Sequence, residues 1–190
     1  EMVDAYGPLE MFSIYRDVFE IKTFGPSYDA VRASGGPCTQ PDAKFEDTDR
    51  IDILLVPGGC GVDAVVEKSD WLDWVSQRAG EAIWVTSVCT GALILARAGV
   101  LHERAATTNK NEFDKVVKEA GDSSIKWRRK ARWVVDGNVL TSSGVSAGVD
   151  MSLDLIERIL GADAANEAAR LSEYVRNPDP DDDPFAKENT

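Results

Sequence analysis

The apolar positions of this chain form two kinds of pattern. Short runs rich in β-branched residues, most of them continuous, are typical of buried parallel strands. These runs predict strands at residues 17–24, 51–56, 82–88, 133–135 and 139–141. The first run alternates with period two, which indicates a half-buried strand. Asp136-Gly137-Asn138 joins the last two, and its glycine supplies the positive φ of a tight turn, so a hairpin is expected there.

Between the strands, apolar residues recur with the spacing of helices. The predicted helices cover residues 8–15, 70–79, 90–98, 111–119, 147–160 and 163–174. Pro8 is expected in the first turn of its helix, where a missing N–H costs little. Glycines are expected to end four later helices, at Gly80, Gly99, Gly121 and Gly161. Strands that alternate with helices predict an α/β fold, with a mainly parallel sheet covered on both faces.

The composition is typical of one soluble domain with a short appendage. Of 190 residues, 43% are apolar and 28% charged, and no run approaches the roughly 18 apolar residues of a membrane span. Residues 1–176 are expected to form the domain, and residues 177–190 an acidic, proline-rich C-terminal arm on the surface.

The charge balance argues against two classes of partner. A net charge of −12 disfavours nucleic-acid binding, which needs a basic face. The densest basic stretch, residues 126–132, is interpreted as the exposed side of a strand. We therefore expect no nucleic-acid partner and, without an apolar span, no membrane partner.

Cysteine and histidine are scarce, which narrows the possible chemistry. Cys38, Cys60 and Cys89 form no CxxC pair and no metal-ligand spacing. Their odd number, with no signal-peptide pattern at the start of the sequence, indicates a reducing compartment, so a cytoplasmic location is expected. The one histidine, His102, lies at the far end of a predicted helix of about ten residues, or roughly 15 Å, from Cys89. A carboxylate is therefore the candidate base.

The strongest local signal surrounds Cys89. Residues 85–93 pass from a buried strand directly into an apolar helix, with Cys89 at the corner and Gly91 two positions later. This pattern predicts a nucleophile elbow, a strained turn that exposes the side chain at its apex. The helix N-terminus is expected to lower the pKa of the thiol, and the N–H of Thr90 to stabilise an oxyanion. An unreactive core cysteine is the alternative that stays open.

A glycine-rich loop at residues 56–61 is expected to face this corner. It follows a buried strand, and the carboxyl ends of neighbouring parallel strands converge on one crevice. Gly59 and Cys60 are therefore candidate substrate- or oxyanion-binding residues, although a plain turn is the alternative. Cys60 could also resolve an oxidised Cys89, but an incidental cysteine is favoured.

A second loop of small residues, 142–150, leads into a helix. Its N–H groups, at Gly144 and Val145, could line a pocket for an anion or a carbonyl group. Ser146 is interpreted as a helix N-cap.

Several segments together resemble the ThiJ/PfpI superfamily, which has the class I glutamine-amidotransferase-like fold. They are Ser87-Val88-Cys89-Thr90-Gly91-Ala92, Pro57-Gly58-Gly59-Cys60-Gly61 and Arg104-Ala105-Ala106-Thr107-Thr108. Residues 3–10, 140–150 and 173–174 further resemble the isocyanide (isonitrile) hydratase subgroup. The resemblance covers nearly the whole chain and implies a flavodoxin-like three-layer α/β sandwich.

In hydratases of this kind a cysteine attacks the isocyanide carbon and an aspartate near the N-terminus transfers protons. Water then releases an N-substituted formamide, without a metal or organic cofactor. The resemblance therefore implies Cys89 as nucleophile, Asp4 as acid/base and Thr90 as support for the intermediate. It also implies no cofactor, a small-molecule substrate and a homodimer.

Two departures from the subgroup bear on this interpretation. The strand that opens the family fold has no counterpart before Asp4, and Asn109-Lys110 stand where the subgroup usually has His-Trp. Three other functions stay open. They are a glyoxalase- or deglycase-like enzyme of the same superfamily, a non-catalytic ligand-sensing or redox-responsive protein and, least favoured, an intracellular peptidase.

Overall fold

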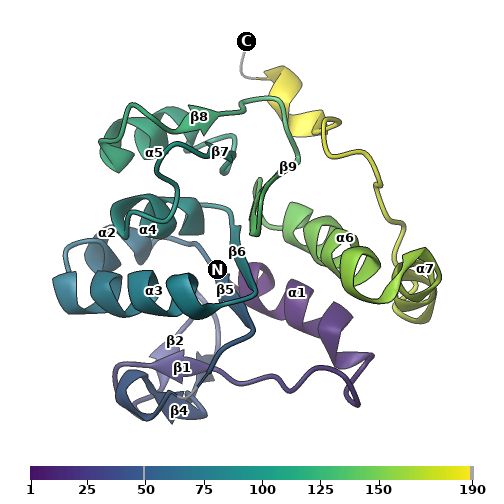
Figure 1. Cartoon of the computed structure of the whole chain (residues 1–190), viewed down its shortest axis with the longest axis horizontal. Coiled ribbons are helices and arrows are strands. Elements are labelled where there is room, and N and C mark those ends of the chain that lie inside the picture. Colours follow the sequence, from purple (N-terminus) through teal and green to yellow (C-terminus); the bar gives the residue numbers. More distant parts are fainter. Residues whose placement is uncertain (49, 189–190) are drawn as a thin grey trace.

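A four-stranded sheet forms the centre of the protein in the computed structural model, which describes residues 1–48 and 50–188 (Figure 1). Its strands, in spatial order, are β5 (Ile53–Val56), β6 (Trp84–Val88), β10 (Val139–Ser142) and β9 (Trp133–Asp136). β5, β6 and β10 are parallel, and β9 is antiparallel to β10. The mainly parallel sheet and the predicted hairpin are confirmed, and the hairpin turns at Gly137 with a φ of 64°.

Helices cover both faces of this sheet (Figure 1). One layer contains α1 (Met2–Ser13), α6 (Ala147–Leu160) and α7 (Ala162–Leu171). The other contains α2 (Val62–Val65), α3 (Ser69–Glu81), α4 (Gly91–Arg97) and α5 (Phe113–Ala120). The predicted flavodoxin-like three-layer sandwich is confirmed, and all predicted helices except the first lie within three residues of the observed bounds.

Shorter elements lie outside the central sheet. The two-residue strands pair as β1 (Phe24–Gly25) with β4 (Ala43–Lys44), β2 (Val31–Arg32) with β3 (Cys38–Thr39), and β7 (Ala105–Ala106) with β8 (Lys126–Trp127). Short 3-10 helices cover Phe45–Asp47 and Pro184–Glu188. The last two residues of the predicted C-terminal arm, Asn189 and Thr190, lie outside the described residues.

Two apolar cores, one on each face of the sheet, hold the layers together. Leu54 and Val85 face the core under α3, α4 and α5, whereas Val88 and Leu140 face the core under α1 and α6. Successive side chains of a strand point to opposite faces, so β6 contributes to both cores. Burial on both faces explains why the strand runs in the sequence are continuously apolar.

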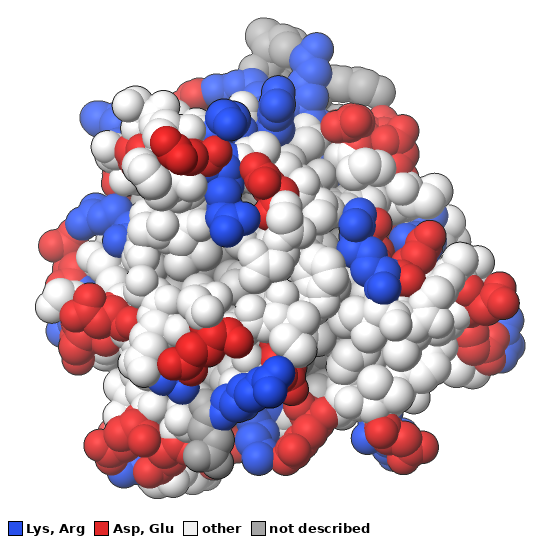
Figure 2. Space-filling model, viewed as in Figure 1, with Lys and Arg blue, Asp and Glu red and all other residues white. Residues whose placement is uncertain are grey.

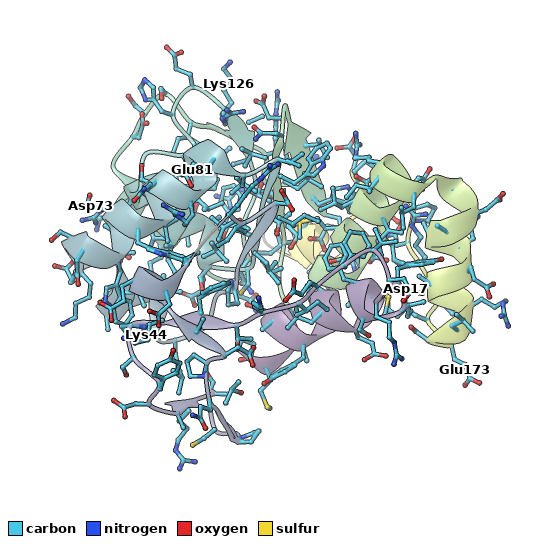
Figure 3. The ribbon with its side chains drawn as sticks, turned by 60° about the horizontal axis from the view of Figure 1, so that its bottom comes forward. Asp17, Lys44, Asp73, Glu81, Lys126 and Glu173 are labelled. Carbon is cyan, nitrogen blue, oxygen red and sulfur yellow. The ribbon has the colours of Figure 1, made fainter. Side chains whose placement is uncertain are left out.

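Most charged residues stay at the periphery. On the face drawn in Figure 2, acidic and basic groups are interspersed around a central area of uncharged residues. The labelled side chains of Asp73, Lys126 and Glu173 project outward from the ribbon in Figure 3. In the described part of the chain, no helix is both long and apolar enough to cross a bilayer.

Several local predictions are wrong. Of residues 17–24, only Phe24 belongs to a strand, because the described chain offers the rest no ladder partner. Pro8 lies in the middle of α1 rather than in its first turn, because the helix already begins at Met2. Gly80 lies inside α3, which continues to Glu81. In the basic stretch, the strand is only two residues long and Arg132 is buried rather than exposed.

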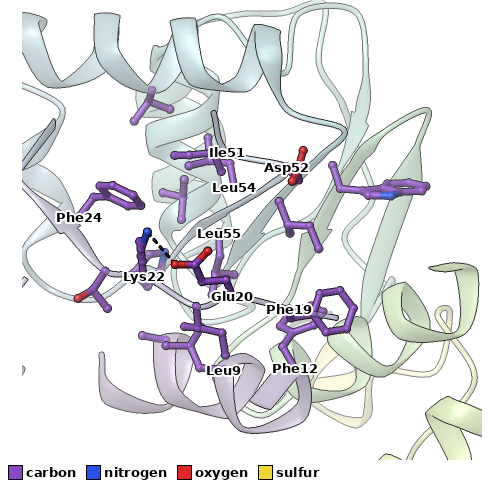
Figure 4. A pocket seen from close by; sticks show the side chains of 18 of the residues that line it. Leu9, Phe12, Phe19, Glu20, Lys22, Phe24, Ile51, Asp52, Leu54 and Leu55 are labelled. Carbon is purple, nitrogen blue, oxygen red and sulfur yellow. Dashed lines mark ion pairs between the residues drawn. The ribbon is translucent and has the colours of Figure 1, made fainter. Parts of the chain in front are cut away.

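The outer edge of β5 borders a groove (Figure 4). The groove has a volume of about 1070 Å³ and lies between β5, α1 and residues 18–24. Its lining is mainly apolar and includes Leu9, Phe12, Phe19, Phe24 and Leu55. Within the described chain, β5 is therefore an open edge of the central sheet.

Candidate active site

Cys89 occupies the sharp turn between β6 and α4. Its φ of 59° lies in the left-handed region, which residues other than glycine rarely adopt, and the residue is 6% exposed. Such strain at a strand-to-helix turn is typical of a nucleophile elbow. Gly91 is needed two positions later, because a Cβ there would lie 2.3 Å from the carbonyl oxygen of Val56. The predicted strained turn is confirmed, but the expectation that it exposes the side chain is wrong, because the surrounding loops bury Cys89.

A buried carboxyl group lies next to the thiol of Cys89. Asp4, on α1, is fully buried, and its Oδ2 accepts a hydrogen bond of 3.1 Å from the N–H of Gly58. The thiol of Cys89 lies close enough to the Asp4 carboxyl group for each to shift the pKa of the other. The first turn of α1 and the loop after β5 thus bring a carboxyl group to the sulfur.

Hydrogen-bond donors surround the other sides of the sulfur. Nδ2 of Asn109 donates to Sγ of Cys89 at 3.2 Å, and the backbone N–H groups of Thr90 and Val145 lie near enough to the sulfur to favour the thiolate. Val145 has a φ of 38°, a strained value for a residue other than glycine. A Cβ on Gly144 would lie 2.6 Å from Nδ2 of Asn109, so only glycine allows this close approach.

Burial and the neighbouring carboxyl group govern the ionisation of Cys89. Burial, followed by the negative charge of Asp4, raises the pKa of the thiol. The hydrogen bonds from Thr90, Asn109 and Val145 lower this pKa, but by less. The expectation that the helix N-terminus gives the thiol a lowered pKa is therefore wrong on balance, because desolvation disfavours the thiolate more strongly.

The pKa of Asp4 is raised as well. Burial is the largest cause, and the amino group of Glu1, the N–H of Gly58 and the thiol of Cys89 oppose it. Two neighbouring groups that both resist ionisation titrate as a coupled pair. At neutral pH the thiol of Cys89 therefore keeps its proton, beside a carboxyl group that also resists ionisation.

The loop after β5 packs against the start of α4. The N–H of Gly59 donates to Oγ1 of Thr90 at 3.0 Å, and a Cβ on Gly58 would lie 2.6 Å from the nitrogen of Thr90. The expectation that this loop faces the elbow is confirmed. Cys60, however, is exposed and its thiol lies 3.1 Å from Oγ of Ser34. No described contact joins Cys60 to Cys89.

Other candidate residues lie outside this group. Nδ1 of His102 lies 2.9 Å from Oδ2 of Asp122, and the histidine side chain is 65% exposed, as expected for a surface loop. Ser146 stands at the N-cap position of α6, but its side chain makes no capping hydrogen bond. Among the described residues, no three His, Cys, Asp or Glu side chains are grouped to hold a metal ion.

The sequence analysis missed two residues that contact Cys89. Asn109 was noted only as a departure from the subgroup, yet it lies 3.2 Å from the sulfur. Oγ1 of Thr108 donates to the carbonyl oxygen of Cys89 at 2.8 Å. The available signal was the position of both residues next to a motif of the resembled family, and the local pattern does not tell which way their side chains point.

The comparison with known proteins defines the class of this protein. Residues 1–158 match the DJ-1/PfpI family, and the chain belongs to that family. An isonitrile hydratase from Pseudomonas putida is 34% identical over 178 residues, which cover 94% of this chain and 75% of the hydratase. The resemblance to the ThiJ/PfpI superfamily is therefore confirmed.

Two further relatives show the range of the family. A ThiJ/PfpI family protein from Pseudomonas syringae, of known crystal structure, is 30% identical with a TM-score of 0.81, over 93% of this chain and 72% of that one. The transcriptional regulator GbdR from Pseudomonas aeruginosa is 28% identical over 92% of this chain, which corresponds to 47% of the regulator. Relatives of this chain thus include an enzyme and a regulator.

Proposed function

We propose that the protein hydrates a small isocyanide to an N-substituted formamide, with Cys89 as nucleophile and Asp4 as proton carrier. The observation that carries this proposal is a buried thiol at a strained elbow, beside a buried carboxyl group that the loop after β5 holds in place. The similarity to an isonitrile hydratase from Pseudomonas putida over 94% of the chain supports the same reaction.

An isocyanide is unusual because its terminal carbon receives both the nucleophile and a proton. In the first step, the sulfur of Cys89 bonds to that carbon while the thiol proton, carried by Asp4, is delivered to the same atom. The product is a thioimidate, R–N=CH–S–Cys89. A thiol that keeps its proton next to a carboxyl group is suited to this addition, because nucleophile and proton arrive from adjacent atoms.

Water completes the reaction in the second step. It adds to the thioimidate carbon, and Asp4 accepts one of its protons and passes it to the nitrogen. The C–S bond then breaks, the proton of the new hydroxyl group is transferred to the sulfur, and R–NH–CHO leaves. The sum is R–NC plus H₂O to R–NH–CHO, with the thiol of Cys89 regenerated.

The donors around the sulfur have a role in both steps. The N–H groups of Thr90 and Val145 and the amide of Asn109 stabilise negative charge as it develops on sulfur or on the attacking oxygen. Glycines at positions 58 and 144 allow the two loops to approach Thr90 and Asn109 closely.

The test measures the rate of formamide production from a simple alkyl isocyanide and from a simple aryl isocyanide. The wild-type protein is expected to produce formamide, Cys89→Ala none, and Asp4→Asn about 10²- to 10⁴-fold less, the usual range for loss of an acid/base group. Cys38→Ala is the control, because Cys38 is exposed on β3. A folded wild-type protein without turnover of either isocyanide would contradict the proposal.

The similarity to a transcriptional regulator over 92% of the chain favours a second function, ligand sensing without turnover. In that case the wild-type protein would bind an isocyanide or another small electrophile without releasing product. Intact-mass measurement separates the two functions, because a sensor would accumulate a stable adduct or noncovalent complex while a hydratase would return to its free mass.

A further inference from the structure

The C-terminal arm returns to the active-site end of the sheet. In Figure 1 it runs from α7 to the neighbourhood of β9. Although the arm is rich in aspartate and proline, Asp183 is 2% exposed and Ala186 is 5% exposed. The N–H of Asn177 donates to Oδ1 of Asp150 at 2.9 Å, which attaches the start of the arm to α6.

Three consecutive backbone hydrogen bonds connect the arm to Cys89. The N–H of Arg132 donates to the carbonyl of Pro180 at 2.6 Å. The N–H of Ser143 donates to the carbonyl of Arg132 at 2.7 Å, and the N–H of Cys89 to the carbonyl of Ser143 at 3.0 Å. The arm therefore supports the loop that lies directly against the elbow.

A buried ion pair forms a second connection. The side chain of Lys110 is 3% exposed, and its Nζ lies 3.7 Å from Oδ2 of Asp183, whose side chain is fully buried. Nζ also donates to the carbonyl of Ala131 at 2.5 Å and to Oγ1 of Thr107 at 2.8 Å. Burial lowers the pKa of Lys110 to about 8, and Asp183 opposes this shift.

Lys110 follows directly on the residues that contact Cys89. Asn109 donates to the sulfur at 3.2 Å, and Thr108 donates to the carbonyl oxygen of Cys89 at 2.8 Å. Nζ of Lys110 reaches back to the carbonyl of Thr108 at 3.4 Å. The buried ammonium group thus holds the turn from which the Asn109 side chain extends.

Burial of two opposite charges is a costly way to attach a surface segment. Apolar side chains of similar volume usually give equal or greater stability than a buried ion pair. What an ion pair adds is a defined geometry, because each partner fixes the other in one place. That geometry is set here one residue away from the amide that touches the sulfur.

We propose that the Lys110–Asp183 pair, with the arm that supplies Asp183, positions Asn109 against the sulfur of Cys89 and so sets the reactivity of the thiol. Lys110 and Asp183 are positioning residues, since neither contacts the reacting atoms. The inference rests on Cys89 as the reactive group of the proposed function, but it does not depend on which substrate the protein takes.

The test measures the alkylation rate of Cys89 by iodoacetamide as a function of pH, without any isocyanide. A Cys38→Ser, Cys60→Ser background removes the two exposed thiols and leaves Cys89 as the only cysteine. Asp183→Asn is compared with Asp181→Asn, the same change at an exposed position of the same arm. Because the readout is alkylation, the result stands whether or not the protein turns over isocyanides.

Loss of the Asn109 hydrogen bond raises the pKa of the thiol, because that bond favours the thiolate. Asp183→Asn is therefore expected to lower the alkylation rate about three- to tenfold below the thiol pKa and to move the pH profile upward. Loss of the Asp183 charge acting only through space would do the opposite, so the sign of the shift separates positioning from simple electrostatics. Asp181→Asn is expected to match the wild-type profile.

A double-mutant cycle tests the route through Asn109. In an Asn109→Ala background, Asp183→Asn is expected to cause no further change, because the group it positions is already absent. Full additivity of the two effects would contradict the proposal.

The Lys110→Met, Asp183→Asn double variant covers the case in which Asp183→Asn alone does not fold, because it leaves no buried charge unpaired. It is expected to fold and to keep the upward shift. A folded double variant with the wild-type pH profile would overturn the proposal and leave the arm with a structural role only.

Discussion

The two borders of the central sheet are built differently. At the β9 border, which we call the closed border, backbone hydrogen bonds link the C-terminal arm to Arg132, Arg132 to the loop after β10, and that loop to Cys89. Arg132 also forms a buried ion pair with Asp150. At the other border, the outer edge of β5 faces a groove of about 1070 Å³ lined by both buried and partly exposed apolar side chains. Buried polar contacts therefore hold the candidate site at one border, whereas at the other border Asp4 depends on α1 and the loop after β5, which also line the groove.

Removal of a buried charge at the closed border is expected to have the largest effect. Asp150 is fully buried, lies 2.6 Å from Nη2 of Arg132, and also accepts a hydrogen bond from the N–H of Asn177. Asp150→Ala leaves a buried guanidinium group without its partner, so it should lower the free energy of unfolding by about 3–5 kcal/mol. Urea unfolding followed by circular dichroism measures this change.

Asp154→Ala is the matched control in the same helix. Asp154 pairs with Arg158 at 2.7 Å, but the arginine side chain is 41% exposed. Loss of such a pair costs less than about 1 kcal/mol. Equal losses in the two variants would mean that the closed border is not held by its buried charges.

Truncation of leucines on the two borders tests the comparison directly. Leu140 on β10 is fully buried, and Leu55 on β5 is partly exposed along the groove, although both contribute to the same core. Leu140→Ala is expected to lower the free energy of unfolding by about 3–4 kcal/mol, and Leu55→Ala by only about 1 kcal/mol. Chemical denaturation of both variants measures the difference, and a larger loss for Leu55→Ala would show that β5 is the better packed strand.

The smallest expected effect is a change in the alkylation rate of Cys89. The negative charge of Asp4 raises the pKa of Cys89, so Asp4→Asn lowers this pKa and increases the thiolate fraction at any pH below it. Iodoacetamide should then alkylate Cys89 about three- to tenfold faster near neutral pH, even though hydration is lost. Mass spectrometry of the Cys89 peptide over a pH series measures the rate, and slower alkylation would contradict the predicted sign.

Local sequence patterns correctly predicted the parts of the fold that depend on residues close together in the chain. The elbow at Cys89 follows from a buried run that ends at a helix with Gly91 two positions later, and the hairpin turn follows from Gly137. The glycine-rich loop of residues 57–61 could be placed at the elbow because parallel strands end at the same edge of a sheet.

Most of the strand predicted at residues 17–24 does not form, because a strand needs a hydrogen-bonded neighbour and the described chain offers none there. The expected lowering of the Cys89 pKa failed for a related reason. Its sign depends on how deeply the thiol is buried and on a charge that comes from α1, and neither quantity is local.

The α/β layering, the corner that carries Cys89 and the small residues that such a corner requires can be predicted from the sequence, since each depends on side chains a few positions apart. The groups that surround the sulfur are known only from the folded chain. Asp4, Asn109 and Val145 come from three distant segments, and the Lys110–Asp183 pair joins residues 73 positions apart along the chain (183 minus 110). Such contacts depend on how the layers pack, and packing is decided by the whole core rather than by any stretch of sequence.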